Sequence, residues 1–381
     1  IMKKMPNNKE EIAKALEEAT QEIDILDGLS AVTDWCSTGC TALDLAISNK
    51  IPGGIPVGRI IQVFGGASTA KTVLATTILG YALRSGKLAF LADTEHTFDP
   101  VFAGYYGLDA KNPEFFYGYG WRKKEEVLQQ PTTIEEFFDE YLDGILKLRY
   151  QRPKIVVADS LTVLPAAIEI EKTMDKQGFG AYRAKQIGLG LRKYHDKMVE
   201  KQVTLVIIDQ TRDSLDSFVK EEIVPGGRSL EFMSSVRLYM KHDKKIENSA
   251  GNPIGVWVKF EVKKNKVGPP FRKGSFKILF EYGLDNTTSN LSWLAGISEN
   301  CKSGDEFKLS TQVTLPVCKN CGHFVIDDYC CDKKEINNIS KRIMDWVTYI
   351  EDNGLEKDLQ GYTATQWKIQ YATEERKPRV W

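Results

Sequence analysis

Residues 65–72, Gly65-Gly66-Ala67-Ser68-Thr69-Ala70-Lys71-Thr72, have the spacing of a loop that binds nucleotide phosphates. They fit G-x-x-x-x-G-K-[ST], except that Ala70 stands where the second glycine is expected. In such a loop backbone N–H groups surround the phosphates, Lys71 reaches the β- and γ-oxygens, and Thr72 offers its hydroxyl to Mg²⁺. Ala70 keeps its N–H and adds a Cβ, which costs free energy only if its φ is positive. The segment predicts a site for ATP and Mg²⁺.

Carboxylates follow two other apolar runs that we interpret as strands. Asp159 ends one run, where it can hold the water shell of the metal ion. Glu95 lies just beyond the other and can polarise an attacking water molecule. Asp99 and Phe102, a few residues farther on, are candidates to contact the nucleotide base. These residues together predict hydrolysis of a bound nucleotide.

Alternating strands and helices are expected to position these side chains. The phosphate loop follows a predicted strand and precedes a predicted helix over residues 73–84. The predicted strands span residues 59–64, 87–93, 154–159 and 204–209. This alternation is typical of an α/β fold with a mostly parallel sheet and helices on both faces. Functional groups then belong at the carboxyl ends of the strands.

The remaining pattern divides the chain into three parts. Strands over residues 236–240, 256–262 and 276–280 are expected to end the sheet as a meander, and an amphipathic helix is expected near residues 339–350. The predicted domains are 1–36, a helical arm and linker, 37–285, an ATPase core, and 286–381, a small α+β domain. In the arm, Asn8 and Glu11 form a capping box before a helical stripe. That helix either packs on its own domain or docks on a neighbouring subunit.

Composition excludes several classes of protein. Of the 381 residues, 51 are Lys or Arg and 52 are Asp or Glu, so a uniformly basic nucleic-acid coat is excluded while a local basic face is not. No apolar run reaches the length of a membrane-spanning helix, and the first residues lack the apolar region of a secretory signal. Seven cysteines make a disulfide framework improbable. We expect a cytoplasmic protein with no membrane partner.

Several segments resemble the RecA family of homologous recombinases. They are CSTGCTALDLAI, GGIPVGRIIQVFGGASTAKT, LAFLADTEHTFDPVFAGYYGLD, KIVVADSLTVLP, VPGGRSLEFMSSVRLYM and VKKNKVGPPF, in order over about residues 36 to 285. The resemblance implies a RecA-fold P-loop ATPase that assembles with itself as a helical filament on single-stranded DNA. It implies that the filament pairs this strand with homologous double-stranded DNA, in recombination and repair, with DNA-stimulated ATP hydrolysis.

The resemblance also implies roles for individual residues. Lys71 and Thr72 match the ligands of the phosphates and Mg²⁺, and Asp159 matches the metal-associated acid. Glu95 matches the catalytic carboxylate, while Asp99 and Phe102 match contacts to adenine. Gln210 matches the glutamine that senses the γ-phosphate and signals to the DNA loops. Lys264 and Lys266 match lysines that reach the nucleotide of the neighbouring protomer.

Two segments resemble the DNA-binding loops of that family. The first is about residues 171–180, EKTMDKQGFG, followed by Arg183 on a helix. The second is about residues 211–229, with Arg212 near its start and Gly226, Gly227 and Arg228 near its end. Glycine pairs let backbone N–H groups approach phosphates closely, and arginine supplies charge.

A basic region follows the second loop. Residues 236–280 contain eleven Lys or Arg against three Asp or Glu. A solvated face is the usual explanation for such a run. Lys241 and Lys259, however, resemble positions of a secondary site that holds the incoming duplex.

The C-terminal part contains a motif of a different kind. Cys318 and Cys321 form a C-x-x-C pair, His323 follows, and Cys330 and Cys331 come shortly after. These are ligands that Zn²⁺ prefers, and adjacent cysteines cannot easily both bind one ion. Either a second cysteine pair, or His323 with one of these two cysteines, completes the site. The alternative is buried or unligated thiols. Cys36 and Cys40 are expected to serve packing alone.

Two other functions are compatible with the same predicted sheet. One is a ring-forming hexameric helicase or translocase, against which the KKNK lysines favour a filament. The other is a weakly hydrolysing recombinase mediator in which Ala70 slows ATP turnover. The presence of Lys71, Glu95 and Gln210 favours an active ATPase over a mediator.

Overall fold

A computed structural model describes residues 32–121, 129–171, 179–213, 222–223, 226–298, 310–326, 331 and 335–371. The described residues from Trp35 onward form one compact unit. The helix predicted for the N-terminal arm lies outside the described residues and stays a prediction.

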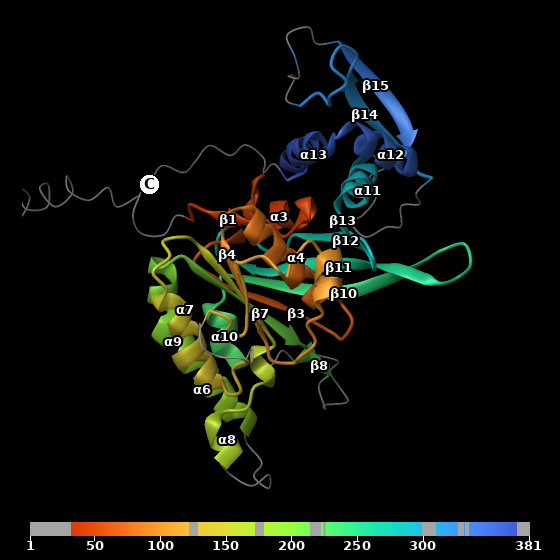
Figure 1. The fold of residues 1–381 in the computed structure, drawn as a ribbon. Helices are drawn as coiled ribbons and strands as arrows, with labels where there is room; N and C mark the ends of the chain where they lie inside the picture. The colour runs from red at the N-terminus through yellow and green to blue at the C-terminus, as the bar shows by residue number, and fades with distance from the viewer. Residues whose placement is uncertain are drawn as a thin grey trace, which may run out of the picture. The chain divides into compact units, whose positions relative to one another are not determined.

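Nine strands form the central sheet in the order β13-β12-β11-β10-β3-β7-β6-β4-β5 (Figure 1). From β3 to β5 all neighbours are parallel, and β10 is parallel to β3. From β10 to β13 neighbours are antiparallel, which confirms the meander. The strands are β3 (Ile60–Gly65), β4 (Leu88–Asp93), β5 (Phe115–Tyr117), β6 (Lys154–Asp159), β7 (Val203–Gln210), β10 (Val236–Glu247), β11 (Pro253–Asn265), β12 (Lys273–Leu279) and β13 (Gly283–Asp285).

Helices bury both faces of the parallel part of this sheet (Figure 1). Along β6, Ile155 and Val157 join one apolar cluster, while Val156 and Ala158 join the other. This alternation follows from the two-residue period of a strand. The first cluster is completed by α3 (Thr41–Ser48) and α4 (Lys71–Arg84). The second cluster is completed by α6 (Ile134–Glu136), the π-helical η1 (Phe137–Leu142), α7 (Asp143–Lys147) and α9 (Phe179–Glu200). The predicted α/β fold is therefore confirmed.

Shorter elements connect these layers. They are β1 (Trp35–Cys36), β2 (Ile55–Pro56), α5 (Pro100–Tyr105), the 3₁₀ turn η2 (Leu161–Val163), α8 (Ala167–Glu171), β8 (Arg212–Asp213), β9 (Glu222–Ile223) and α10 (Gly227–Met233). The described residues of the predicted second DNA loop thus include β8, β9 and part of α10. Within residues 211–229, β8 pairs antiparallel with β9, and the last three residues already belong to α10.

The C-terminal part contains a third apolar cluster. It is formed by α11 (Asn286–Ser298), β14 (Gln312–Cys318), β15 (Ile336–Arg342), α12 (Ile343–Asn353) and α13 (Glu356–Gln370). The helix predicted near residues 339–350 begins later than expected, so the prediction was wrong for its first residues. Residues 339–342 belong to β15 because they pair antiparallel with β14, where Ile339 faces Leu315. The domain boundary after Asp285 stays a prediction.

None of the described helices is long and apolar enough to cross a membrane.

Candidate nucleotide-binding site

The phosphate loop joins the carboxyl end of β3 to the start of α4 and borders a cavity of about 270 Å³. The neighbouring strand ends contribute Glu95, Asp159 and Gln210 to the same cavity. Its remaining lining residues are Ala67, Ser68, Thr69, Ala70, Lys71, Thr72, Val73, Ser160 and Ile208. The fold therefore brings the predicted phosphate, metal and catalytic residues to one place, as expected for the strand ends of a parallel sheet.

The backbone of the loop is tightly constrained. A Cβ added to Gly65 would lie 2.0 Å from the carbonyl oxygen of Met240, so only glycine fits there. Ala70 caps α4 with φ 64° and ψ 27°, in the left-handed region that glycine adopts without cost. Because this φ is positive, the Cβ of Ala70 costs free energy that glycine would not. Ser68 has φ 56° as well.

Lys71 lies across the loop that carries it. Its Nζ donates to the carbonyl oxygens of Gly65 at 3.0 Å and Gly66 at 2.6 Å, and to Thr69 Oγ1 at 3.2 Å. Burial lowers the pKa of this ammonium, and the carboxylates of Asp159, Glu95 and Asp209 oppose that effect. The loop carbonyls hold the charge beside the cavity, where a phosphate group can replace them as its partner.

Thr72 and Asp159 form a hydrogen bond across the cavity. Thr72 Oγ1 donates to Asp159 Oδ2 at 2.7 Å. Burial raises the pKa of Asp159 to about 6, with the hydrogen bond from Thr72 acting in the opposite direction and Glu95 and Asp93 adding to the rise. A hydroxyl beside a buried carboxylate is a donor set that suits Mg²⁺ and its water molecules.

Glu95 is held at the cavity by a residue that the sequence reasoning overlooked. Asp93, at the end of β4, accepts backbone N–H bonds from Thr97 at 3.2 Å and Phe98 at 2.9 Å, and a hydroxyl bond from Tyr117 at 3.0 Å. These bonds close the turn that carries Glu95, which is itself exposed. An exposed carboxylate on a fixed turn can reach a water molecule in the cavity.

The two candidate base contacts do not line this cavity. Asp99 caps α5, where its Oδ1 accepts from the backbone N–H groups of Val101 at 2.7 Å and Phe102 at 3.1 Å. The side chain of Phe102 is 52% exposed. Their role toward adenine stays a prediction.

A second network of buried hydrogen bonds lies next to the site, and the sequence analysis did not predict it. Asp209 accepts hydrogen bonds from Gln62 Nε2 and Thr162 Oγ1, both at 2.7 Å. Gln62 in turn accepts from Arg237 Nε at 2.7 Å, and Arg237 pairs with Glu231 of α10. Burial raises the pKa of Asp209 to about 6. The sequence feature that could have indicated this network is a polar residue inside each of two apolar strands, Gln62 in β3 and Arg237 in β10.

The two lysines of the KKNK segment lie at the C-terminal end of α10. Lys264 Nζ donates to the carbonyl oxygens of Glu231 and Phe232, both at 2.7 Å, and Lys266 Nζ donates to that of Phe232 at 3.1 Å. Neither lysine lines the phosphate-loop cavity of its own chain. Any contact with a nucleotide would therefore be made outside that cavity.

The candidate DNA-binding residues lie on several elements around α10. Arg183 of α9 forms an ion pair with Glu169 of α8, with a closest distance of 2.6 Å. Arg212 belongs to β8, opposite Ile223 of β9. Gly226 and Gly227 have φ of 93° and 72° at the start of α10, and Arg228 is exposed beside them. Most of the first predicted loop lies outside the described residues.

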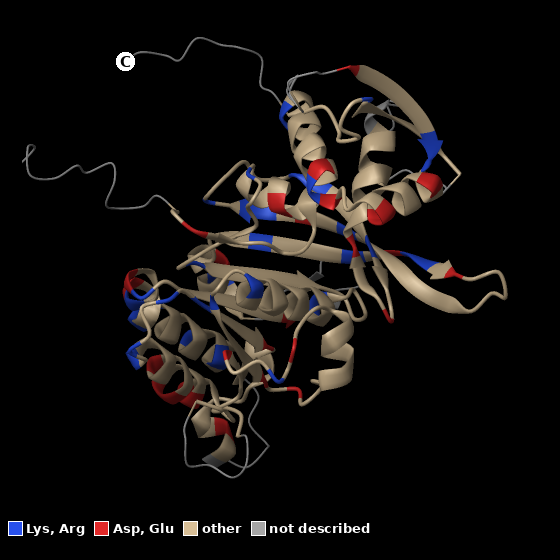
Figure 2. Cartoon of the chain, turned by 45° about the horizontal axis from the view of Figure 1, so that its top comes forward, with Lys and Arg blue, Asp and Glu red and all other residues tan. Residues whose placement is uncertain are grey.

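The basic region lies on the long strands of the meander, along which Lys and Arg are scattered among uncharged residues and a few acidic ones (Figure 2). Lys241 and Lys259 face each other across β10 and β11. Lys259 forms an ion pair with Asp243 at 2.7 Å. Like charges placed opposite each other destabilise a sheet, and an anion bound between them would relieve that cost.

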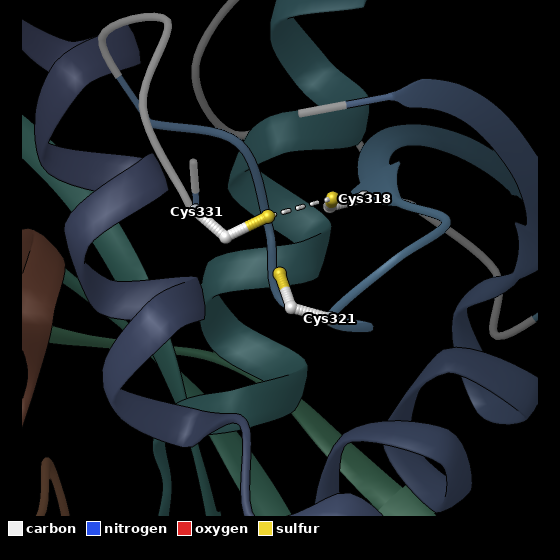
Figure 3. Close-up of side chains that lie close together, drawn as sticks. All are labelled: Cys318, Cys321 and Cys331. Carbon is white, nitrogen blue, oxygen red and sulfur yellow. Dashed lines mark hydrogen bonds between the residues drawn. The ribbon is translucent and has the colours of Figure 1, made fainter. Parts of the chain in front are cut away.

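In the C-terminal part, three of the five candidate zinc ligands come together (Figure 3). The Sγ atoms of Cys318, Cys321 and Cys331 lie within 4.8 Å of one another. His323 is outside this group, and its Nδ1 lies 2.5 Å from Asp358 Oδ2. Cys330 lies outside the described residues. Cys36 and Cys40 are buried in the main apolar cluster, as expected for packing residues.

Comparisons with known proteins point in one direction. The family model of the RecA N-terminal domain matches residues 22–285. The chain is 32% identical to protein RecA of Thermus thermophilus over 305 residues, covering 76% of this chain and 83% of that relative. It is 34% identical over 275 residues to protein RecA of Rubrobacter xylanophilus, covering 71% and 73%. A crystal structure of the RadB recombinase matches 65% of this chain and 98% of that chain, with 19% identity and a TM-score of 0.44.

Proposed function

Because this chain belongs to the RecA family, we propose that it is an ATP-dependent DNA recombinase. It forms a filament on single-stranded DNA and pairs that strand with a homologous duplex. The observation that carries this proposal is the convergence of Lys71, the Thr72–Asp159 pair, Glu95 and Gln210 on one cavity at the strand ends.

The cavity supports binding and hydrolysis of ATP. The loop N–H groups and Lys71 bind the phosphates, and Thr72 with Asp159 binds Mg²⁺ through its hydroxyl and through water. When held there, Mg²⁺ would supply positive charge to the phosphate oxygens as negative charge develops on them. Glu95 orients and deprotonates the attacking water molecule.

The network around Asp209 supports coupling between ATP and DNA. Gln210 ends β7 at the cavity, directly after Asp209. From Asp209 the hydrogen bonds continue through Gln62 and Arg237 to Glu231 on α10. Since α10 follows the second predicted DNA loop, ATP binding at Gln210 can change the position of that loop. Single-stranded DNA then binds at Arg183, Arg212 and the Gly226–Arg228 turn, and the duplex binds at Lys241 and Lys259.

The position of Lys264 and Lys266 supports an assembly through the nucleotide. Both lie away from the cavity of their own chain, so they are available to the ATP of a neighbouring protomer. ATP binding and filament assembly would then be one linked equilibrium.

Substitution of Glu95 by glutamine tests the hydrolytic step. Glu95→Gln is expected to leave ATP and single-strand binding within about twofold and to lower DNA-stimulated ATP turnover by about 10²–10³-fold, because an amide cannot accept the proton from water. Binding is measured by fluorescence anisotropy and turnover by phosphate release. The control Glu200→Gln changes an exposed carboxylate at the end of α9 and should keep full turnover. Normal turnover in Glu95→Gln would contradict this assignment.

One observation favours a second candidate function, a recombinase mediator with weak turnover. Ala70 has a positive φ within the phosphate loop, where strain can weaken nucleotide binding. A DNA-stimulated turnover at or near zero in the unmodified chain, with filaments of a partner recombinase stabilised by it, would favour the mediator. Joint molecules formed by this chain alone with ATP would favour the recombinase.

A further inference from the structure

Three cysteine side chains converge in the C-terminal part, away from the nucleotide cavity (Figure 3). Cys318 is the last residue of β14, Cys321 lies in the turn that follows, and Cys331 precedes β15. Cys318 is buried, while Cys321 and Cys331 are partly exposed. The cluster therefore combines one buried thiol with two that solvent partly reaches.

The spacing of the sulfur atoms fits one metal ion. The Sγ atoms of Cys318 and Cys331 are 3.6 Å apart, and all three lie within 4.8 Å of one another. With Zn–S bonds of about 2.3 Å, two thiolates of a tetrahedral site are separated by about 3.8 Å. A disulfide bond would bring two of these atoms to about 2.05 Å. The observed spacing, in which Cys318 and Cys331 share a thiol hydrogen bond, is close to that of two ligands of one ion and far from that of a disulfide bond.

The turn between the first two cysteines is shaped by backbone hydrogen bonds. Gly322 N donates to the carbonyl oxygen of Cys318 at 2.8 Å, and Cys318 N donates to that of His323 at 2.9 Å. Gly322 has φ 76°, which glycine adopts without strain. The chain thereby reverses within residues 318–323 and places Cys321 beside Cys318, as a C-x-x-C metal turn requires.

The third cysteine is brought in by pairing of the strands. Cys318 faces Ile336 in the register of β14 and β15, so residue 331 lies only a few positions before the paired segment. Lys319 strengthens this closure, because its N–H donates to the carbonyl oxygen of Glu335 at 2.9 Å and its Nζ pairs with the Glu335 carboxylate at 2.8 Å. The turn after β14 and the segment before β15, which are separate in the sequence, thus lie together at the cysteine cluster.

We propose that Cys318, Cys321 and Cys331 bind a structural zinc ion. Each thiol releases its proton when the ion binds, and a fourth side chain completes the tetrahedron. Soft thiolates select Zn²⁺ over Mg²⁺ or Ca²⁺, which prefer oxygen ligands. His323 is not a ligand in this proposal, because it lies outside the group and bonds with Asp358.

The ion would join the turn after β14 to the segment before β15. The apolar cluster of this part is small and is built around Trp346, Phe324 and Leu315. Small cores gain stability from a metal ion that links distant segments of the chain. The zinc ion therefore holds the β14–β15 pair closed, and its loss should expose that pair before the ATPase core unfolds.

Metal analysis of the full-length purified protein tests the proposal. Inductively coupled plasma mass spectrometry is expected to find about one zinc ion per chain after dialysis against metal-free buffer. Cys321→Ser and Cys331→Ser should each retain less than about a tenth of an ion per chain. Cys40→Ala, which alters a buried cysteine of the main cluster, and His323→Ala should both keep the full content.

A second measurement needs no variant that could fail to fold. An organomercurial titrated into the unmodified protein should release the zinc in step with the loss of its thiolates, and cobalt substituted for zinc should show thiolate-to-metal charge-transfer absorption. A metal-free protein, iron in place of zinc, a disulfide bond between Cys318 and Cys331, or full zinc content in both serine variants would each overturn the proposal. DNA-stimulated ATP turnover is measured in parallel, so that failure of the zinc site is distinguished from failure of the proposed recombinase.

Discussion

At the residue scale, Ala70 is the clearest departure from the expected phosphate loop. It caps α4 with φ 64° and ψ 27°, the conformation for which glycine is usually selected. The backbone N–H that a phosphate needs is kept, and the strain is confined to one Cβ. Lys71 and Thr72 therefore begin α4 in the same way as they would after glycine.

Ala70→Gly is expected to change the free energy of unfolding by less than about 0.5 kcal/mol. Relief of the left-handed alanine should offset the greater freedom of glycine in the unfolded chain. Ala75→Gly, the matched change inside α4, should lower the free energy of unfolding by about 1 kcal/mol or more because its backbone is helical. Urea unfolding without nucleotide measures both. An equal loss in the two variants would show that Ala70 carries no strain.

The site residues differ in how far the sequence could predict them. Lys71, Thr72 and Asp159 follow from motif spacing and from strand ends, and all three line the cavity. The positioning roles of Asp93 and Asp209 could not be predicted in the same way. Each depends on partners from distant strands, such as Tyr117 for Asp93 and Gln62 for Asp209, and only folding brings them within hydrogen-bonding distance.

At the scale of elements, α10 carries residues of both predicted regions: Glu231 ends the network from Asp209, and Gly227 and Arg228 are predicted DNA contacts. Its first residue, Gly227, has φ 72°, and an added Cβ would lie 2.8 Å from Ala184 Cβ on α9. Its other end meets Lys264 and Arg237 through Glu231. The helix is therefore held at one end by close packing and at the other by charge.

Gly227→Ala is expected to weaken single-strand binding by about tenfold, because the free-energy cost of one alanine at a positive φ corresponds to about that change in affinity. ATP turnover without DNA should stay within about twofold, because the cavity does not include this residue. Anisotropy of a labelled oligonucleotide measures the affinity. Gly104→Ala on α5 is the matched control, since nothing lies within 4 Å of its added Cβ. Unchanged affinity in Gly227→Ala would remove α10 from the DNA surface.

At the scale of the whole molecule, the proposed filament predicts an active site that a second chain completes. Lys264 bonds to the end of α10 in its own chain and does not reach its own cavity. If Lys264 acts only within its own chain, mixing two inactive variants restores no turnover. If Lys264 acts on the nucleotide of a neighbouring chain, the mixture recovers part of it.

Lys71→Ala and Lys264→Ala are each expected to lose DNA-stimulated ATP turnover. An equal mixture of the two should recover about a quarter of the wild-type turnover, since that share of sites combines an intact loop with an intact lysine from the next protomer. Phosphate release with excess single-stranded DNA measures the recovery. The control is each variant mixed with its own kind. A mixture with no more turnover than its components would restrict Lys264 to its own chain.

The sequence by itself determined the α/β alternation, the strands that end in carboxylates and the phosphate loop, because these depend on local periodicity and motif spacing. It also indicated candidate cysteine ligands, although it left their set open. Tertiary structure alone decided that residues 339–342 pair with β14 and that the expected helix begins only after them. It also decided that Cys331 joins Cys318 and Cys321 while His323 does not, and that Arg237 connects β3 to α10. Each of these outcomes depends on strand register, which juxtaposes residues far apart in the chain and leaves no periodic trace in the sequence.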